Sequence, residues 1–204
     1  MAEHGINGVS LRSILSRAEA NSAALHYHFG SRDGLVEAIL ARRGRKPSLR
    51  RREMLDDLEA RTRAIDVYDL VGAAVDPMIE MLVEEGEPGR RFLRFIARLQ
   101  SDRTGIHQAE EDRYFPDIRS RMTTMAADAC PHLLEAERMR RLTMMIDTML
   151  QSLANAEVMS EAWTGNTHHD DLADFASSLK DFLAGALSAP VRRSLVDADR
   201  ANTN

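Results

Sequence analysis

Apolar residues recur along most of this chain at the spacing of an α-helix, and no segment shows the strict alternation of a half-buried strand. Paired apolar positions over 66–85 give one helix an apolar face; they are Leu70/Val71, Ala74/Val75, Met78/Ile79 and Leu82/Val83. Comparable patterns cover 90–100, 107–129 on both sides of Pro116, 135–159 and 172–187. The hydrophobic pattern therefore predicts an all-α protein.

Prolines, glycines and polar stretches mark where these helices should end. We expect Pro47 to interrupt the helix that starts at Ser31, because proline lacks the backbone N–H that a helix needs. Pro77 lies inside the helix over 66–85 and is expected to bend it. GEPG then ends that helix, and the polar stretch WTGNTHHDD forms a linker before the last one.

Two short helices are predicted near the N-terminus, where Ser10 and Asn21 are favourable N-cap residues. The first covers about 10–17 and the second 22–29, with Gly30 at the position where glycine commonly ends a helix. Apolar residues on both helices provide a small shared core. Two short helices joined by a tight turn are typical of a helix-turn-helix DNA-binding motif.

Charge is distributed unevenly along the chain. Residues 1–52 carry ten lysines and arginines against four acidic residues, a net charge of +6, whereas the remainder has 17 basic and 28 acidic residues, a net charge of −11. A basic segment joined to an acidic one favours binding of a polyanion at the N-terminal end. A chance cluster of solvated charges over 42–52 explains the same distribution, so charge alone leaves both interpretations open.

The segments EHGINGVSLRSILSRA and NSAALHYHFGSRDGLVEAIL resemble the DNA-binding domain of TetR-family transcriptional repressors over residues 1–43. In that family a pattern like LHYHF closes the recognition helix, and a Ser-basic-acidic element like SRD opens the connecting helix. Glu19 and His26 depart from the turn glycine and the tyrosine that are usual there. Met1 falls within the family's first helix, so the resemblance predicts a motif in which most of that helix is missing.

The resemblance also implies how this motif meets DNA. The candidate DNA-binding residues are Ser10, Arg12, Ser22, Ala23, His26, Tyr27, His28 and Arg32. The first two would contact phosphate and base edges, and the small residues at the start of the recognition helix would face bases. The two histidines and Arg32 would contact phosphates, and Tyr27 a base or sugar. The expected partner is double-stranded DNA.

By the same resemblance the chain divides into a helix-turn-helix domain over 1–46, a helical effector-binding and dimerisation domain over 47–188, and a flexible tail over 189–204. TetR-like proteins bind small molecules in an apolar cavity, and methionine-rich helices suit a cavity of irregular shape. The candidate lining residues are Met78, Phe92, Phe95, Ile96, Tyr114, Phe115, Met122 and Trp163. Ordinary core packing is an alternative explanation for each. The scarcity of aromatic residues slightly favours an acyl or lipid-like effector.

The last two long helices carry broad apolar stripes that one helical hairpin cannot bury on both sides. Pairing with a symmetry mate would form a four-helix bundle, which predicts a homodimer. Its two recognition helices would meet successive major grooves about 34 Å apart, which predicts a palindromic operator. The alternative is that both helices cover their own domain's core.

Catalysis and metal binding find little support in the sequence. His26 and His28 are two residues apart and point to different faces of a helix, and the HHDD stretch ending at Asp171 is typical of a solvated loop. No Gly-x-Ser-x-Gly elbow is present, so we expect neither an enzyme nor a bound cofactor or metal. One cysteine, Cys130, and the absence of a long apolar run predict a soluble cytoplasmic protein without a membrane partner.

These observations predict a homodimeric, ligand-responsive transcriptional regulator. It would be a repressor that an apolar or amphipathic small molecule releases from its operator. The alternative function is a helical small-molecule-binding or interaction protein that has lost DNA binding through the missing first helix.

Overall fold

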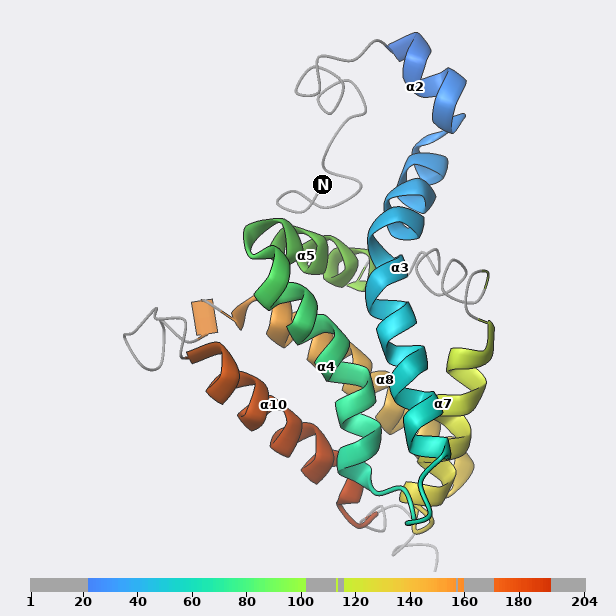
Figure 1. Ribbon diagram of the computed structural model, residues 1–204, viewed down its shortest axis with the longest axis vertical. Coiled ribbons are helices and arrows are strands. Elements are labelled where there is room, and N and C mark those ends of the chain that lie inside the picture. The colour runs from blue at the N-terminus through green and yellow to red at the C-terminus, as the bar shows by residue number, and fades with distance from the viewer. Residues whose placement is uncertain (1–21, 102–112, 114–115, 157, 160–170, 192–204) are drawn as a thin grey trace, which may run out of the picture.

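The computed structural model describes residues 22–101, 113, 116–156, 158–159 and 171–191. Within these ranges the regular elements are helices, which confirms the predicted all-α fold (Figure 1). They are α2 (Ser22–Phe29), α3 (Arg32–Glu59), α4 (Val67–Glu85), α5 (Glu87–Ser101), α7 (Pro116–Ala129), α8 (Glu135–Ala154) and α10 (Asp171–Ser188). None of these described helices is long and apolar enough to cross a membrane.

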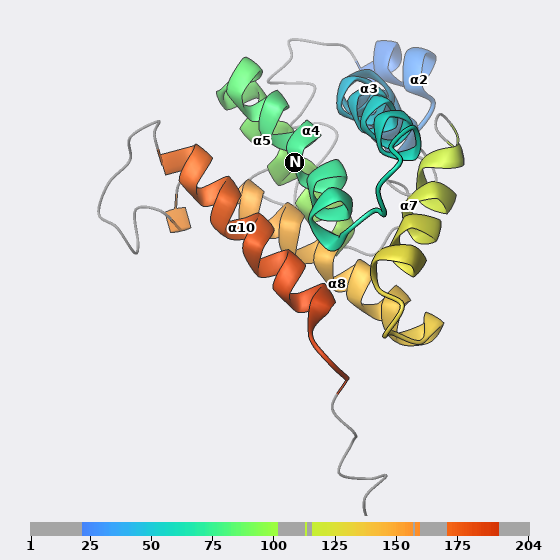
Figure 2. The ribbon, with the colours of Figure 1, turned by 60° about the horizontal axis from the view of Figure 1, so that its bottom comes forward.

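The helices form a body from which one arm projects (Figure 1), and α10 lies against α8 in this body (Figure 2). Helix α4 is central to the body and contacts α3, α5, α7 and α10, while α8 packs against α5 and α10. The first part of α3 extends beyond the body and carries α2 at its end (Figure 1). We call α2 and the first turns of α3 the arm.

One cluster of buried apolar side chains holds the body together and draws on α3, α4, α5, α7, α8 and α10. Its fully buried members include Leu55 on α3, Leu70 on α4, Leu93 on α5 and Leu183 on α10. Burying a leucine of this size stabilises the fold by about 1.5–3 kcal/mol relative to leaving it in water. The helices therefore stay together because each contributes an apolar stripe to this cluster.

Helix α3 runs without a break from Arg32 to Glu59, so the expectation that Pro47 interrupts it is wrong. A proline inside a helix costs about 3 kcal/mol, and packing has to offset that cost. Here the Pro47 ring is buried, and ion pairs with α4 lie on both sides of it. They are Arg43–Glu85 at 2.5 Å, Lys46–Glu84 and Arg50–Glu80 at 2.9 Å. The boundary drawn between residues 46 and 47 falls inside this continuous helix.

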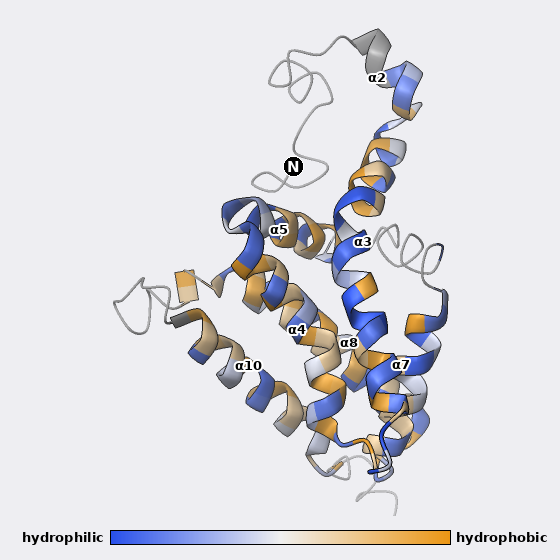
Figure 3. Cartoon of the chain, viewed as in Figure 1, coloured by the Kyte–Doolittle hydropathy of each residue, from blue (hydrophilic) through white to orange (hydrophobic). Residues whose placement is uncertain are grey.

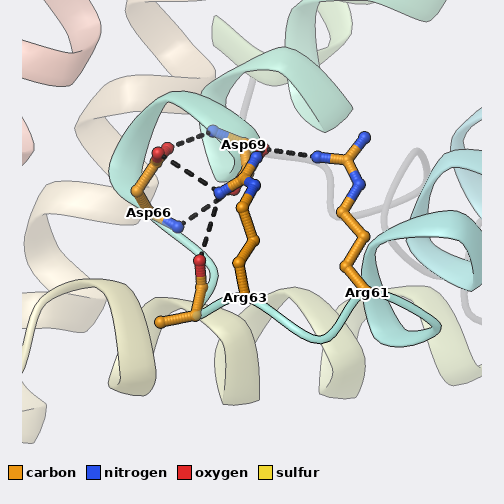
Figure 4. A network of polar contacts seen from close by, with 5 residues as sticks. Arg61, Arg63, Asp66 and Asp69 are labelled. Carbon is orange, nitrogen blue, oxygen red and sulfur yellow. Dashed lines mark hydrogen bonds and ion pairs between the residues drawn. The ribbon is translucent and has the colours of Figure 1, made fainter.

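Helix α4 begins at a capping box that also receives two arginines (Figure 4). The Asp66 carboxylate accepts a hydrogen bond from the Asp69 backbone N–H at 2.9 Å, and the Asp69 carboxylate accepts from the Asp66 N–H at 3.1 Å. Arg63 and Arg61 donate to the same Asp69 carboxylate, at 2.6 and 3.0 Å. These bonds anchor the α3–α4 connection. Beyond it, α4 continues through the buried Pro77 to Glu85.

The remaining helix ends agree with the sequence to within a few residues. Gly86 has a positive φ of 59° and separates α4 from α5, and α5 already starts at Glu87 because proline suits the first turn of a helix. Helix α7 begins at the predicted break, Pro116. Helix α8 ends at Ala154, whereas the pattern predicted a helix to 159; residues 156, 158 and 159 are again helical, and at the break Asn155 donates its side-chain amide to the Gln151 carbonyl at 2.7 Å. Such a bond competes with the helix.

Candidate nucleic-acid interface

The corner between α2 and α3 has the conformation that the sequence predicted. Gly30 ends α2 with a φ of 67°, a left-handed conformation that glycine adopts without steric cost. The Ser31 hydroxyl then accepts a hydrogen bond from the Gly34 N–H at 3.1 Å and caps α3. A Cβ atom at Gly34 would lie 2.1 Å from the Phe29 carbonyl oxygen, so this position requires glycine. The angle between the two helices is therefore fixed by local contacts.

The second half of α2 presents polar and aromatic side chains to solvent. His26, Tyr27 and His28 are all exposed, and the Tyr27 side chain is 85% exposed. The His26 ring donates from Nδ1 to the Gly30 carbonyl at 3.1 Å, and the Tyr27 and His28 rings meet edge-on with centroids 5.1 Å apart. An exposed tyrosine of this kind contributes little to the core, so its placement fits contact with another molecule.

The structure describes the positions of only some of the other candidate DNA-binding residues. Arg32 lies half-buried in the first turn of α3, next to the corner. Ser22 and Ala23 form the start of α2. Ser10 and Arg12 lie outside the described residues, as does the first helix of the predicted motif. The structure therefore brings together the α2 and Arg32 positions of the predicted site.

The basic stretch over 42–52, which we call the basic segment, makes the middle of α3 strongly hydrophilic (Figure 3), and five of its seven basic side chains contact the body. Besides the three ion pairs with α4, Arg52 pairs with Asp117 of α7 at 3.4 Å, and Arg51 is buried against α4. Hydrogen bonding to Glu84 raises the pKa of Lys46, so this amine stays charged. Arg42, Arg45, Lys46 and Arg52 are exposed.

These ion pairs provide a structural explanation for the uneven distribution of charge along the chain. From the sequence, the basic segment was interpreted either as a polyanion-binding surface or as a chance cluster of solvated charges. In the structure, its main partners are carboxylates of the acidic body. The chain that precedes it, 1–41, carries three arginines and four acidic residues. The spacing of Glu80 and Glu84 was a sequence signal for this interface, because residues four apart lie on the same face of a helix.

The predicted effector-binding residues that the structure describes lie in one part of the core. Met78, Phe92, Phe95 and Ile96 are buried, and Met122 is half-buried against the same cluster. The Phe92 and Phe95 rings have centroids 6.4 Å apart. Tyr114, Phe115 and Trp163 lie outside the described residues. Core packing accounts for the burial of the described residues, so their role toward an effector stays a prediction.

An exposed apolar face runs along α10. Leu179, Leu183 and Leu187 point into the body, while Phe182 is 63% exposed. Gly185, Ala186 and Ala189 follow Phe182 at helical spacing and are also exposed, so small residues surround the aromatic ring on one face. The adjacent helix α8 adds partly exposed apolar side chains at Met139, Met144 and Ile146.

Other reactive groups in the described part of the chain are inert or scattered. Cys130 is buried, and burial raises the pKa of its thiol, which disfavours the reactive thiolate. The described residues contain no group of three or more His, Cys, Asp or Glu side chains placed to hold a metal. The arm and the helical body are therefore the features from which function is inferred.

An arm that carries a short exposed helix on an all-helical body fits a class of DNA-binding regulators, and sequence comparison identifies the family. The family described as "Bacterial regulatory proteins, tetR family" matches residues 1–39, and "Tetracyclin repressor-like, C-terminal domain" matches residues 72–186. The second match covers more than half of the chain, so the protein belongs to the TetR family and is a DNA-binding transcriptional regulator. The comparison with curated proteins gave no match.

Proposed function

We propose that this protein is a homodimeric repressor that binds a palindromic operator and is released from it by a small apolar or amphipathic molecule. The observation that carries the proposal is the construction of the arm. The exposed His26, Tyr27 and His28 stand on a helix whose angle to α3 is fixed at Gly30 and Ser31, and α3 continues unbroken into the body. A change in the body can therefore reorient the DNA-reading surface.

The exposed groups of α2 suit the backbone and base edges of DNA. Imidazole and phenol groups donate hydrogen bonds to phosphate oxygens, and such contacts position a recognition helix in the major groove. Five of the seven basic side chains of the basic segment contact the body, so the charge that this segment adds near the arm comes mainly from the exposed Arg42 and Arg45. We therefore infer that direct contacts of α2 and Arg32 matter more here than a broad basic patch.

The α10 face supports the dimer. An aromatic ring flanked by small residues permits close packing of a symmetry-related helix, and an isologous interface of α8 and α10 would make a four-helix bundle. Burying Phe182 and its neighbours there would remove from water an apolar face that the body leaves exposed. Two arms related by a two-fold axis would require a palindromic site.

The apolar cluster between α4, α5 and α7 supports the choice of effector. Its described members are sulfur-containing, aliphatic and phenyl side chains without a charged group among them. Such surroundings favour an acyl or similar lipid-like molecule over a charged one, because burying an unpaired charge is costly. An effector that binds better to a body conformation with displaced arms would lower operator affinity.

One observation favours a second function, a helical small-molecule-binding protein that does not bind DNA. The 1–41 segment has no excess of basic residues, and non-specific DNA binding depends on such an excess. Dimerisation and ligand binding without operator affinity would identify this function. Regulators of this family are generally not enzymes, so we propose no catalytic activity.

Fluorescence anisotropy with labelled DNA from upstream of the gene tests the proposal. We expect saturable binding that weakens with salt and is abolished by Tyr27→Ala. Tyr68→Ala is the matched control, because Tyr68 is also an exposed tyrosine but lies on α4. Equal binding by both variants would contradict recognition through α2, and no specific binding by the wild type would favour the second function.

A further inference from the structure

Pro77 leaves one backbone acceptor of α4 without its normal helical donor. In an α-helix, the carbonyl of residue 73 accepts from the backbone N–H of residue 77, and residue 77 is proline, which has no N–H. The Ala73 carbonyl is also in a buried part of the helix. A buried carbonyl without a donor is costly, so another group has to satisfy it.

The donor comes from α3. Arg51 donates from Nε to the Ala73 carbonyl and from Nη2 to the Ala74 carbonyl, each at 3.2 Å. Arg51 is 7% exposed, whereas the neighbouring Arg50 is partly exposed and pairs with a carboxylate. An arginine is well suited to this position, because its planar fork donates two hydrogen bonds to adjacent acceptors. Proline in α4 and arginine in α3 therefore form a matched pair.

A second helix, α10, contacts the same turn of α4 from the other side. Asp76, directly before Pro77, accepts a hydrogen bond from Lys180 of α10 at 3.0 Å. Helix α4 packs against both α3 and α10. One turn of α4 thus contacts both α3, which carries the arm, and α10, which carries the exposed Phe182.

We propose that Arg51 is a positioning residue that sets the orientation of the arm through the Ala73 carbonyl, which Pro77 leaves without a backbone donor, and the adjacent Ala74 carbonyl. Sliding or rotating α3 against α4 would pull the guanidinium away from both carbonyls, so the pair holds α3 in one register. Met78, a candidate effector contact, directly follows Pro77. A molecule that moves this turn would change the arm orientation. The consequence for operator affinity rests on the proposed function, whereas the pairing itself does not.

A double-mutant cycle tests the pairing. Arg51→Met keeps a long side chain but removes the donors, and Pro77→Ala gives residue 77 the N–H that the Ala73 carbonyl lacks. In urea denaturation we expect Arg51→Met to lower the folding equilibrium constant about tenfold or more in the wild type and clearly less in the Pro77→Ala background. Arg50→Met is the matched control, and its effect should be the same in both backgrounds. Equal losses for Arg51→Met in both backgrounds would overturn the proposal.

The arm orientation is measured by pulsed electron paramagnetic resonance. Spin labels at Asp33→Cys on the arm and Asp128→Cys on α7, both exposed positions, report the arm-to-body distance within one chain when labelled protein is diluted with unlabelled protein. Cys130 is buried and should not react with the label. We expect Arg51→Met to shift or broaden this distance and Arg50→Met to leave it unchanged. An unchanged distance in Arg51→Met would refute the positioning role, whether or not the protein binds DNA or dimerises.

Discussion

Arg43 lies over the ring of Phe92, with its guanidinium carbon 5.7 Å from the ring centroid. The same guanidinium donates to the Glu85 carboxylate at 2.5 Å and to the Pro88 carbonyl at 2.9 Å. Arg43 belongs to α3, while its three partners lie at the end of α4 and the start of α5. This residue therefore ties the arm-bearing helix to the part of the body that contains the predicted effector-contacting phenylalanine.

We predict that Arg43→Met destabilises the protein by about 1–2 kcal/mol, because it removes a cation–π contact and a partly exposed ion pair. Urea denaturation followed by circular dichroism measures the change. Arg42→Met is the control, since Arg42 is an exposed neighbour on the same helix. An equal effect of both substitutions would show that the Arg43 contacts contribute no stability.

Gly34→Ala should disrupt the corner between α2 and α3. The added methyl would meet a backbone carbonyl 2.1 Å away, and backbone atoms cannot move aside as a flexible side chain can. We expect loss of DNA binding with little change in the unfolding of the body. Gly44→Ala on the same helix is the control: its Cβ would lie 3.9 Å from Phe92, and it should raise stability by about 0.5–1 kcal/mol. Operator binding retained by Gly34→Ala would contradict the rigid corner.

Lowering the pH should destabilise the start of α4, because the hydrogen bonds to Asp69 favour its ionised carboxylate. Burial by itself raises the pKa of Asp69, but hydrogen bonds from Arg63 and the Asp66 backbone outweigh it, and the pKa is lowered. The ionised carboxylate therefore stabilises the fold at a pH above the unfolded-state pKa of about 3.9, and this contribution disappears as the pH falls through the lower folded-state pKa. Stability measured from neutral to acidic pH should fall more steeply in the wild type than in Asp69→Asn. Asp57→Asn, at an exposed position, should follow the wild type.

A charged residue introduced into the exposed face of α10 should convert the proposed dimer into a monomer. Phe182→Glu places a carboxylate at the centre of the proposed interface, where a buried unpaired charge is strongly unfavourable. We expect sedimentation equilibrium to show a monomer with an unchanged circular dichroism spectrum, because the side chain is exposed in the single chain. Val83→Glu, at an exposed apolar residue of α4, should leave the dimer intact. A dimeric Phe182→Glu variant would place the interface elsewhere.

Arg121 should stabilise the contact between α7 and the end of α3. It donates to Asp56 at 2.7 Å and to Glu59 at 2.8 Å, and hydrogen bonding to Glu59 raises its pKa. Because both carboxylates are half exposed, water screens these ion pairs, and we expect Arg121→Met to lower the free energy of unfolding by only about 1–2 kcal/mol. Arg119→Met, on an exposed side chain of the same helix, is the comparison for urea denaturation. The Arg121 effect should shrink at high salt.

Local signals made much of the fold predictable. Gly30 and Ser31 end and start their helices where the sequence placed them, because a left-handed glycine and a capping hydroxyl act over a few residues. Pro47 was misread because tertiary packing on α4 outweighs the lost backbone hydrogen bond, and packing partners distant in sequence do not appear in a local pattern. The same limit hid the pairing of Arg51 with the Ala73 carbonyl.

The candidate site was predictable to the extent that the family motif carries it. His26, Tyr27 and His28 are exposed on α2, which fits their predicted role without testing it. The ion pairs of the basic segment could not be predicted, because charge counts do not reveal which surface a side chain faces and the acidic partners lie 30 to 65 positions further along the chain. Hydrophobic side chains at Phe92 and Phe95 illustrate a further limit, since a core residue and a cavity-lining residue have the same sequence pattern.

The unbroken α3 has a mechanical consequence for the whole molecule. Its 28 residues form a rod about 42 Å long at the usual rise of about 1.5 Å per residue, and Arg32 lies about 16 Å beyond Arg43. The part of α3 between Arg32 and Arg43 contains no proline, so it follows a tilt of the helix at its base. It converts the tilt into a sideways displacement at the tip, of about 3 Å for a 10° tilt over this length. A small adjustment among buried side chains thus becomes a misfit larger than a hydrogen bond can tolerate at the surface of DNA.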